Sequence, residues 1–263
     1  MASALSSTTR GGVVHLRMER PDLHNAFDAG LIGELTAVLA AAGADGTVRA
    51  VVLSGAGPSF SAGADLNWMR GMAAAGEAEN REDALALARL MRTLDELPKP
   101  TVARVHGAAF GGGVGLVACC DIAIGLSGAK FGLTESRLGL LPAVISPYVV
   151  AAIGPRQARR WFTTAETFDA AEALRIGLLH EVAADVDELD RAVERQVALL
   201  LKAGPVASAG AKQLVREVAL QADRDLLDHL NANRIAALRV SPEGQEGLSA
   251  FLDKRAPAWT AKD

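Results

Sequence analysis

Strand patterns alternate with helix patterns through the first half of this chain, and this alternation constrains the fold more than any other feature. Apolar and polar residues alternate from Val13 to Met18, as they do in a half-exposed strand. Helical spacing runs from Asp28 to Ala41 and from Asn80 to Leu97, and apolar strand patterns occur at Ala50 to Leu53 and Thr101 to Val105. The alternation predicts an α/β fold in which helices wrap a sheet.

The second half of the chain carries mainly helical patterns, because the strand signal fades after about Pro142. Long amphipathic helices that follow a complete α/β core often pack on a neighbouring subunit, which is what we expect of the helices from Ala203 onward. We therefore divide the chain into a core that holds the site, residues 1–202, and a C-terminal helical oligomerisation region, residues 203–263. Gly71 to Glu79 has no periodic face and predicts a mobile loop beside the site.

The composition excludes several classes of protein. Half of the residues are hydrophobic but only 4% are aromatic, so Ala, Val, Leu and Ile must form the core. The net charge of −4 argues against a nucleic-acid or anionic-membrane partner. Residues 1–9 contain no apolar stretch typical of a secretory signal, and the longest apolar stretch, Ala108 to Cys120, is too short to span a bilayer. We expect a soluble cytoplasmic protein.

The chain contains two cysteines, Cys119 and Cys120, adjacent in an apolar run. We interpret them as small core residues in a reducing compartment. No group of His, Cys, Asp and Glu residues has the spacing of metal ligands, so we expect no metal. His106 precedes a glycine-rich turn, and we interpret it as a hydrogen-bonded structural residue at a strand end.

Two glycine-rich turns and one later acid carry the chemical signal. The turns are Phe60-Ser-Ala-Gly-Ala-Asp-Leu66 and Phe110-Gly-Gly-Gly-Val-Gly115, and the acid is Glu135. Glycine permits a positive φ and close approach of a ligand to the backbone. A strand that ends in glycines and continues as a helix presents unpaired N–H groups at the positive end of that helix. Together the turns predict an oxyanion hole, although either turn alone is more often a packing feature.

In chain order, these segments resemble the crotonase superfamily of enoyl-CoA hydratases and isomerases over nearly the whole chain. The matching residues are Arg20-Pro21, Asn25-Ala26, both glycine-rich turns, Cys120-Asp121-Ile122, Phe131 to Glu135, Leu138 to Pro142 and the tail Gly247 to Arg255. The resemblance implies a spiral of ββα units with a C-terminal helical trimerisation region, assembled as a homotrimer or a dimer of trimers. It also implies an acyl-CoA substrate and no separate cofactor, because coenzyme A is part of the substrate.

The resemblance assigns roles to particular residues. The N–H groups of Ala64 and Gly112 would form the oxyanion hole, and Glu135 would be the catalytic acid and base. Trp68 would line the acyl pocket, although core packing explains it equally well. The residues implied to contact coenzyme A are Ala62, Gly63, Asp65, Leu66 and Lys254. Lys254 would reach the phosphates from a neighbouring subunit, and the alternative for it is a solvated helix end.

The chain departs from the family pattern at Gly115. Many hydratases of the family use two glutamates, and the first would fall at Gly115, whereas Glu135 aligns with the second. One carboxylate can move a proton between C2 and C4 without water, so chemistry alone favours an isomerase. The alternative interpretation of Glu135 is a surface acid paired with Arg137.

The flanking segments favour a hydratase. Residues 113–123 and 138–150 look like the methylglutaconyl-CoA hydratase branch, whose substrates are branched and carboxylated. We therefore predict an enoyl-CoA hydratase, with 3-methylglutaconyl-CoA as a candidate substrate and with Gly115, as part of the acyl pocket, giving room for the branched chain. An enoyl-CoA Δ-isomerase and a non-catalytic acyl-CoA-binding paralogue are the alternatives.

Overall fold

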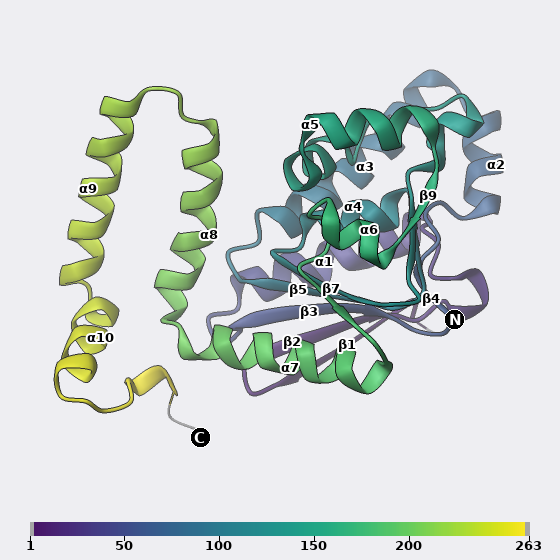
Figure 1. The fold of residues 1–263 in the computed structure, drawn as a ribbon. Helices are drawn as coiled ribbons and strands as arrows, with labels where there is room; N and C mark the ends of the chain where they lie inside the picture. The colour runs from purple at the N-terminus through teal and green to yellow at the C-terminus, as the bar shows by residue number, and fades with distance from the viewer. Residues whose placement is uncertain (1–2, 261–263) are drawn as a thin grey trace.

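The computed structural model describes residues 3–260 and shows two sheets, surrounding helices and a helical arm (Figure 1). Residues 1–2 and 261–263 lie outside the described part. The first two belong to the segment in which no signal pattern was found, and the last three belong to the predicted oligomerisation region. None of the described helices is long and apolar enough to cross a membrane.

The larger sheet has six strands, of which all but the first run parallel to their neighbours. In spatial order they are β1 (Leu5–Arg10), β2 (Val13–Met18), β3 (Ala50–Gly55), β5 (Thr101–Val105), β7 (Ile122–Leu126) and β10 (Glu181–Ala183). The strands predicted near residues 13, 50 and 101 are therefore confirmed. Parallel strands in this sheet need crossover connections, which the helices supply.

The smaller sheet places one short strand after each of three strands of the larger sheet. Its order is β4 (Ser59–Ser61), β6 (Ala108–Phe110), β8 (Lys130–Gly132) and β9 (Thr167–Asp169). The pairs β3–β4, β5–β6 and β7–β8 each divide between the two sheets before the chain enters a helix, and this repeat is the predicted ββα spiral. Strands β9 and β10 contradict the expectation of helices alone after Pro142. Each has three residues, too few for a periodic signal.

Helices cover both faces of the six-stranded sheet. The main core lies between this sheet and the helices α1 (Ala29–Ala44), α3 (Glu77–Asp95), α4 (Gly112–Cys119) and α5 (Ser146–Thr164). Helix α7 (Val186–Lys202) packs on the opposite face over a second apolar cluster, and α6 (Ala170–Arg175) joins β9 to β10. Cys119 and Cys120 are buried free thiols, and burial raises the pKa of Cys120 to about 12, which confirms them as core residues.

The expectation of a loop at Gly71 to Glu79 is wrong, because helices occupy most of this segment. Helix α2 (Leu66–Ala74) ends just before α3 begins. The Asn80 side chain donates to the carbonyl of Met72 at 2.9 Å, which ties the start of α3 to the end of α2. This contact joins two helices across a break and leaves no periodic pattern in the sequence.

The last helices form an arm that extends away from the sheets (Figure 1). The arm comprises α8 (Pro205–Leu220), α9 (Arg224–Val240) and α10 (Pro242–Leu252). Helix α8 is held to the core by ion pairs from Lys212 to Asp121 at 2.9 Å and from Arg216 to Glu96 at 2.7 Å. Much of the apolar surface of the arm is exposed, including Val215, Leu220, Val240, Phe251 and Leu252.

Candidate active site

The two glycine-rich turns touch each other, because β4 and β6 are parallel neighbours and each turn follows one of these strands. A Cβ atom added at Gly63 would lie 2.8 Å from the carbonyl oxygen of Phe110. One added at Gly113 would lie 2.5 Å from the carbonyl oxygen of Ser61. Such separations exclude any side chain, so glycine is what lets the two backbones meet.

The first turn directs the N–H of Ala64 away from Phe27, its partner in an isolated β-bridge. Phe27 donates its N–H to the carbonyl of Gly63 at 2.6 Å and accepts from the N–H of Asp65 at 2.8 Å, forming a parallel bridge with Ala64. In a parallel bridge of this kind, the residue between the two bonds points its own N–H to the other side. Within residues 3–260, the Ala64 N–H donates to no protein acceptor.

The second turn supplies the other donor, because α4 begins at Gly112. The first N–H groups of a helix have no partner within it. Gly111 precedes the helix with φ of 49°, a conformation that suits glycine. A Cβ atom at Gly112 would lie 2.5 Å from a ring carbon of Phe27. The backbone of Phe27 thus holds one donor turn while its ring packs against the other, a role that the sequence analysis missed.

Glu135 lies beside the second turn. It sits on the 3₁₀ helix η2 (Thr134–Leu138), and its Oε1 atom lies 3.1 Å from the position of a Cβ added at Gly111. Its Oε2 atom is buried without a hydrogen-bond partner in the described part of the chain, and Glu135 pairs with neither Arg137 nor another base there. Burial raises the pKa of the Glu135 carboxyl above its ordinary value. A half-buried, unpaired carboxyl group of raised pKa is suited to proton transfer.

The space beside Gly115 is filled by protein. A Cβ atom there would lie 2.4 Å from Cγ2 of Ile145 and 3.2 Å from Cε of Met91. The space into which a side chain at residue 115 would point is therefore not free for an acyl chain. In that space, the expectation that Gly115 gives room for a branched acyl chain is wrong. The space where the first glutamate would stand is apolar and occupied, so no acid at this position accompanies Glu135.

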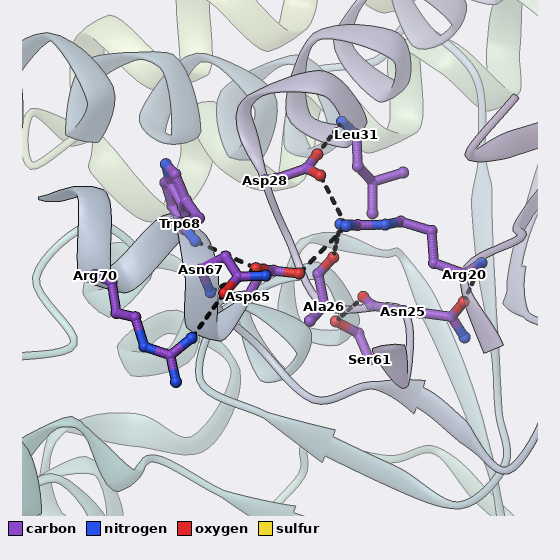
Figure 2. A network of polar contacts seen from close by, with 10 residues as sticks. All are labelled: Arg20, Asn25, Ala26, Asp28, Leu31, Ser61, Asp65, Asn67, Trp68 and Arg70. Carbon is purple, nitrogen blue, oxygen red and sulfur yellow. Dashed lines mark hydrogen bonds and ion pairs between the residues drawn. The ribbon is translucent and has the colours of Figure 1, made fainter. Parts of the chain in front are cut away.

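Asp65, the acid of the first glycine-rich turn, points its side chain toward Arg20 and the start of α2 (Figure 2). The carboxylate of Asp65 accepts the N–H groups of Asn67 at 2.8 Å and Trp68 at 3.2 Å, which caps α2, and it pairs with Arg20 at 3.2 Å. Burial by itself would raise the pKa of Asp65, but these N–H groups and the Arg20 guanidinium outweigh it and lower that pKa. The Asp65 side chain is thus committed to structure, whereas the side chain of Leu66 is exposed.

Comparison with known proteins shows which family the chain matches. Residues 8–262 match the family described as enoyl-CoA hydratase/isomerase. The chain belongs to this family. It is 32% identical to a crotonyl-CoA hydratase of Syntrophomonas wolfei, over 94% of each chain. A crystal structure of an enoyl-CoA hydratase from Shewanella pealeana is 47% identical and superposes with a TM-score of 0.93, covering 97% of this chain and 96% of that one. Pseudomonas aeruginosa AtuE is 41% identical with a TM-score of 0.95, covering 98% of this chain and all of that one.

The structure places two further predicted residues, Trp68 on α2 directly after the first turn and Lys254 just after α10. The Trp68 indole donates to Asp83 at 2.9 Å and packs partly buried against the core, so it joins α2 to α3. Lys254 is exposed at the end of α10, and Figure 1 shows α10 on the opposite side of the molecule from α2. The fold therefore does not bring Lys254 to the glycine-rich turns of its own chain.

His106 has the structural role that the sequence predicted. Its Nε2 atom lies 2.9 Å from the carbonyl oxygen of Gly57, and since a carbonyl only accepts, this nitrogen carries the proton. Burial lowers the pKa of His106, which keeps the ring neutral near pH 7. Within residues 3–260 no three His, Cys, Asp or Glu side chains form a metal-binding group.

Proposed function

We propose that the protein adds water across the α,β double bond of an enoyl-CoA thioester. The observation that carries this proposal is the half-buried Glu135 carboxyl, whose Oε2 atom is buried without a partner, beside a turn whose first helical N–H belongs to Gly112. Ala64 supplies the second donor from the adjacent turn. The hydratase names of the relatives in the same family support hydration over the other reactions that this geometry permits.

In the proposed reaction, Glu135 takes a proton from water while the water oxygen bonds to C3 of the acyl group. The electron pair of the double bond moves toward the thioester carbonyl, whose oxygen becomes enolate-like between the N–H groups of Ala64 and Gly112. Protonated Glu135 then gives its proton to C2 and becomes a carboxylate again. Each such donor contributes roughly 3–4 kcal/mol to the transition state in comparable sites. In this reaction one carboxylate, that of Glu135, makes both proton transfers.

We further propose a branched, carboxylated substrate such as 3-methylglutaconyl-CoA. Support comes from the resemblance of residues 113–123 and 138–150 to the methylglutaconyl-CoA hydratase branch. The segment that begins at Glu135 continues with exposed apolar side chains at Leu138 and Leu140, which suit the hydrocarbon part of an acyl group. Arg137 in the same segment is exposed and pairs with no acid in the described part of the chain, so it offers a cation to a substrate carboxylate.

The test is a product-resolved assay of the purified protein on crotonyl-CoA, 3-methylglutaconyl-CoA and a 3-enoyl-CoA. Hydration supports the proposal, and a preference for 3-methylglutaconyl-CoA supports the branched substrate. A shifted double bond as the sole product establishes the isomerase, and binding without turnover establishes the acyl-CoA-binding paralogue. A strong preference for crotonyl-CoA contradicts the branched substrate.

Glu135→Gln tests the assignment of the base. We expect turnover to fall by about 10²–10⁴-fold, the usual contribution of a general acid or base, while affinity for the acyl-CoA is largely kept. Glu194→Gln is the matched control, because Glu194 is exposed on α7 and forms no ion pair within residues 3–260. A Glu135→Gln variant with near-normal turnover contradicts the assignment.

We also propose that the arm packs on a second copy of this chain in a homotrimer or a dimer of trimers. The exposed apolar side chains of the arm, Phe251 and Leu252 among them, support this, and so does the distance of Lys254 from its own site. In such an assembly, Lys254 would serve the acyl-CoA site of a neighbour. Light scattering measures the assembly, and a monomeric wild-type protein at micromolar concentration contradicts it.

A further inference from the structure

One guanidinium group joins three segments beside the first glycine-rich turn (Figure 2). Arg20 donates from Nη1 to the carbonyl of Ala26 at 2.5 Å, and its Nη2 lies 2.8 Å from Asp28 and 3.2 Å from Asp65. The side chains of Arg20 and Asp65 are 14% and 8% exposed, so water screens their contact weakly, whereas Asp28 is 37% exposed. Arg20 is therefore a fixed junction and not a surface charge.

In both Asp28 and Asp65, one carboxylate oxygen caps a helix and the other faces Arg20. In Asp28, Oδ1 accepts the N–H of Leu31 and caps α1, whereas Oδ2 faces Arg20. In Asp65, Oδ1 caps α2 and Oδ2 faces Arg20. Arg20 thus ties the starts of two helices to each other and to the backbone at Ala26.

These contacts lie on both sides of the bridge that orients Ala64. Ala26 precedes Phe27, which pairs with the first turn, and Asp65 follows Ala64 directly. A movement of either flank would rotate the Ala64 N–H. The backbone of Arg20 is itself anchored, because its N–H donates to the Asn25 side chain at 2.9 Å, and that side chain also donates to the carbonyl of Ser59 at 2.8 Å.

We propose that Arg20 is a positioning residue for the Ala64 donor of the oxyanion hole, an assignment that rests on the proposed function. Arg20 acts through Ala26 and Asp65 and does not need to touch the substrate. Lysine cannot replace it, because a single ammonium group cannot keep the planar fork that reaches one carbonyl and two carboxylates at once.

Arg20→Lys is the test, with Arg17→Lys as its matched control. Arg17 lies on β2, is 53% exposed and pairs with Glu19 at 3.6 Å, with no hydrogen bond or ion pair to either glycine-rich turn within residues 3–260. We measure kcat and KM on the enoyl-CoA that the wild type hydrates fastest, and the fraction of bound acetoacetyl-CoA present as its ultraviolet-absorbing enolate. For Arg20→Lys we expect kcat to fall by about 10–100-fold, as for a displaced catalytic group, with KM changed less than about threefold and a smaller enolate fraction. Arg17→Lys should match the wild type.

A merely structural role would lower the melting temperature and the amount of folded protein without changing the kcat of the folded fraction, and that result overturns the assignment. Should Arg20→Lys not fold, Asp65→Asn keeps the capping oxygen and removes the charge that Arg20 binds, and the same kinetic split is expected. A wild type that hydrates no enoyl-CoA refutes the proposed function. In that case, the fraction of bound acetoacetyl-CoA present as enolate still tests the positioning role of Arg20. Equal enolate fractions in Arg20→Lys and Arg17→Lys overturn that role.

Discussion

Gly115→Ala and Ile145→Ala form a pair of substitutions whose effects on stability depend on each other. Gly115 is buried inside α4, and an added Cβ would lie 2.4 Å from Cγ2 of Ile145. Carbon atoms normally approach to about 3.5–4.0 Å, so one of the two must move by about 1 Å. The clash is with a branch methyl group close to the backbone, which moves less readily than the end of a long side chain.

The expected free energies follow from this contact. Overpacking of a core costs about 1–3 kcal/mol, whereas alanine in a helix interior is favoured over glycine by about 0.5–1 kcal/mol. Gly115→Ala alone should therefore lower the free energy of unfolding by up to about 2 kcal/mol. Ile145→Ala alone opens a cavity and should lower it by about 2–5 kcal/mol. In the Ile145→Ala background the methyl group at 2.4 Å is gone, but Cβ of residue 145 at 3.0 Å and Cε of Met91 at 3.2 Å remain, so Gly115→Ala should be less destabilising than in the wild type.

Urea unfolding at one fixed protein concentration measures the cycle, because stability of an assembled protein depends on concentration. Ile145→Val is the control, since valine keeps the methyl group that meets the added Cβ. We expect Gly115→Ala to be as destabilising in the Ile145→Val background as in the wild type, and to be less destabilising in the Ile145→Ala background. Equal effects of Gly115→Ala in the wild type and both of these backgrounds, within about 0.5 kcal/mol, would refute the packing argument.

Three further predictions concern the site. The hydration rate should fall on acidification at a pH above 4.5, the ordinary value for a glutamate, because burial raises the pKa of Glu135 and the base must be ionised; a pH–rate profile checks this. Gly63→Ala should lower kcat by about 10²-fold or more, since φ of 87° and the Phe110 carbonyl at 2.8 Å force the turn to move, and steady-state kinetics measure it. Because the pKa of Asp65 is lowered in the folded state, the stabilisation that the ionised Asp65 carboxylate gives the fold is complete above pH 3.8 and is lost as pH falls through the folded pKa. The free energies of unfolding of the wild type and of Asp65→Asn, measured with urea, should therefore converge below the folded pKa.

The local features of the fold could be predicted from short stretches of sequence. A period-two pattern located β2, apolar runs located β3 and β5, and helical spacing located the main helices, because burial of residues leaves a trace in the local sequence. The glycine-rich turns and Glu135 were also evident, since only glycine permits the close backbone approach that the structure contains at Gly63 and Gly113. Strands of three residues, such as β9, were missed because so short a segment has no period.

How these features come together depends on contacts between elements that are distant in the sequence. Phe27 joins two turns that are about 50 residues apart in the chain, and Arg20 joins the caps of two helices, through contacts that depend on which strands pair. The apolar filling at Gly115 depends on Ile145, 30 positions later in the chain, and no local pattern records such a neighbour. Local sequence encodes an element because its residues share one surface, whereas the site arises from packing between elements that the chain brings together only when the sheets form.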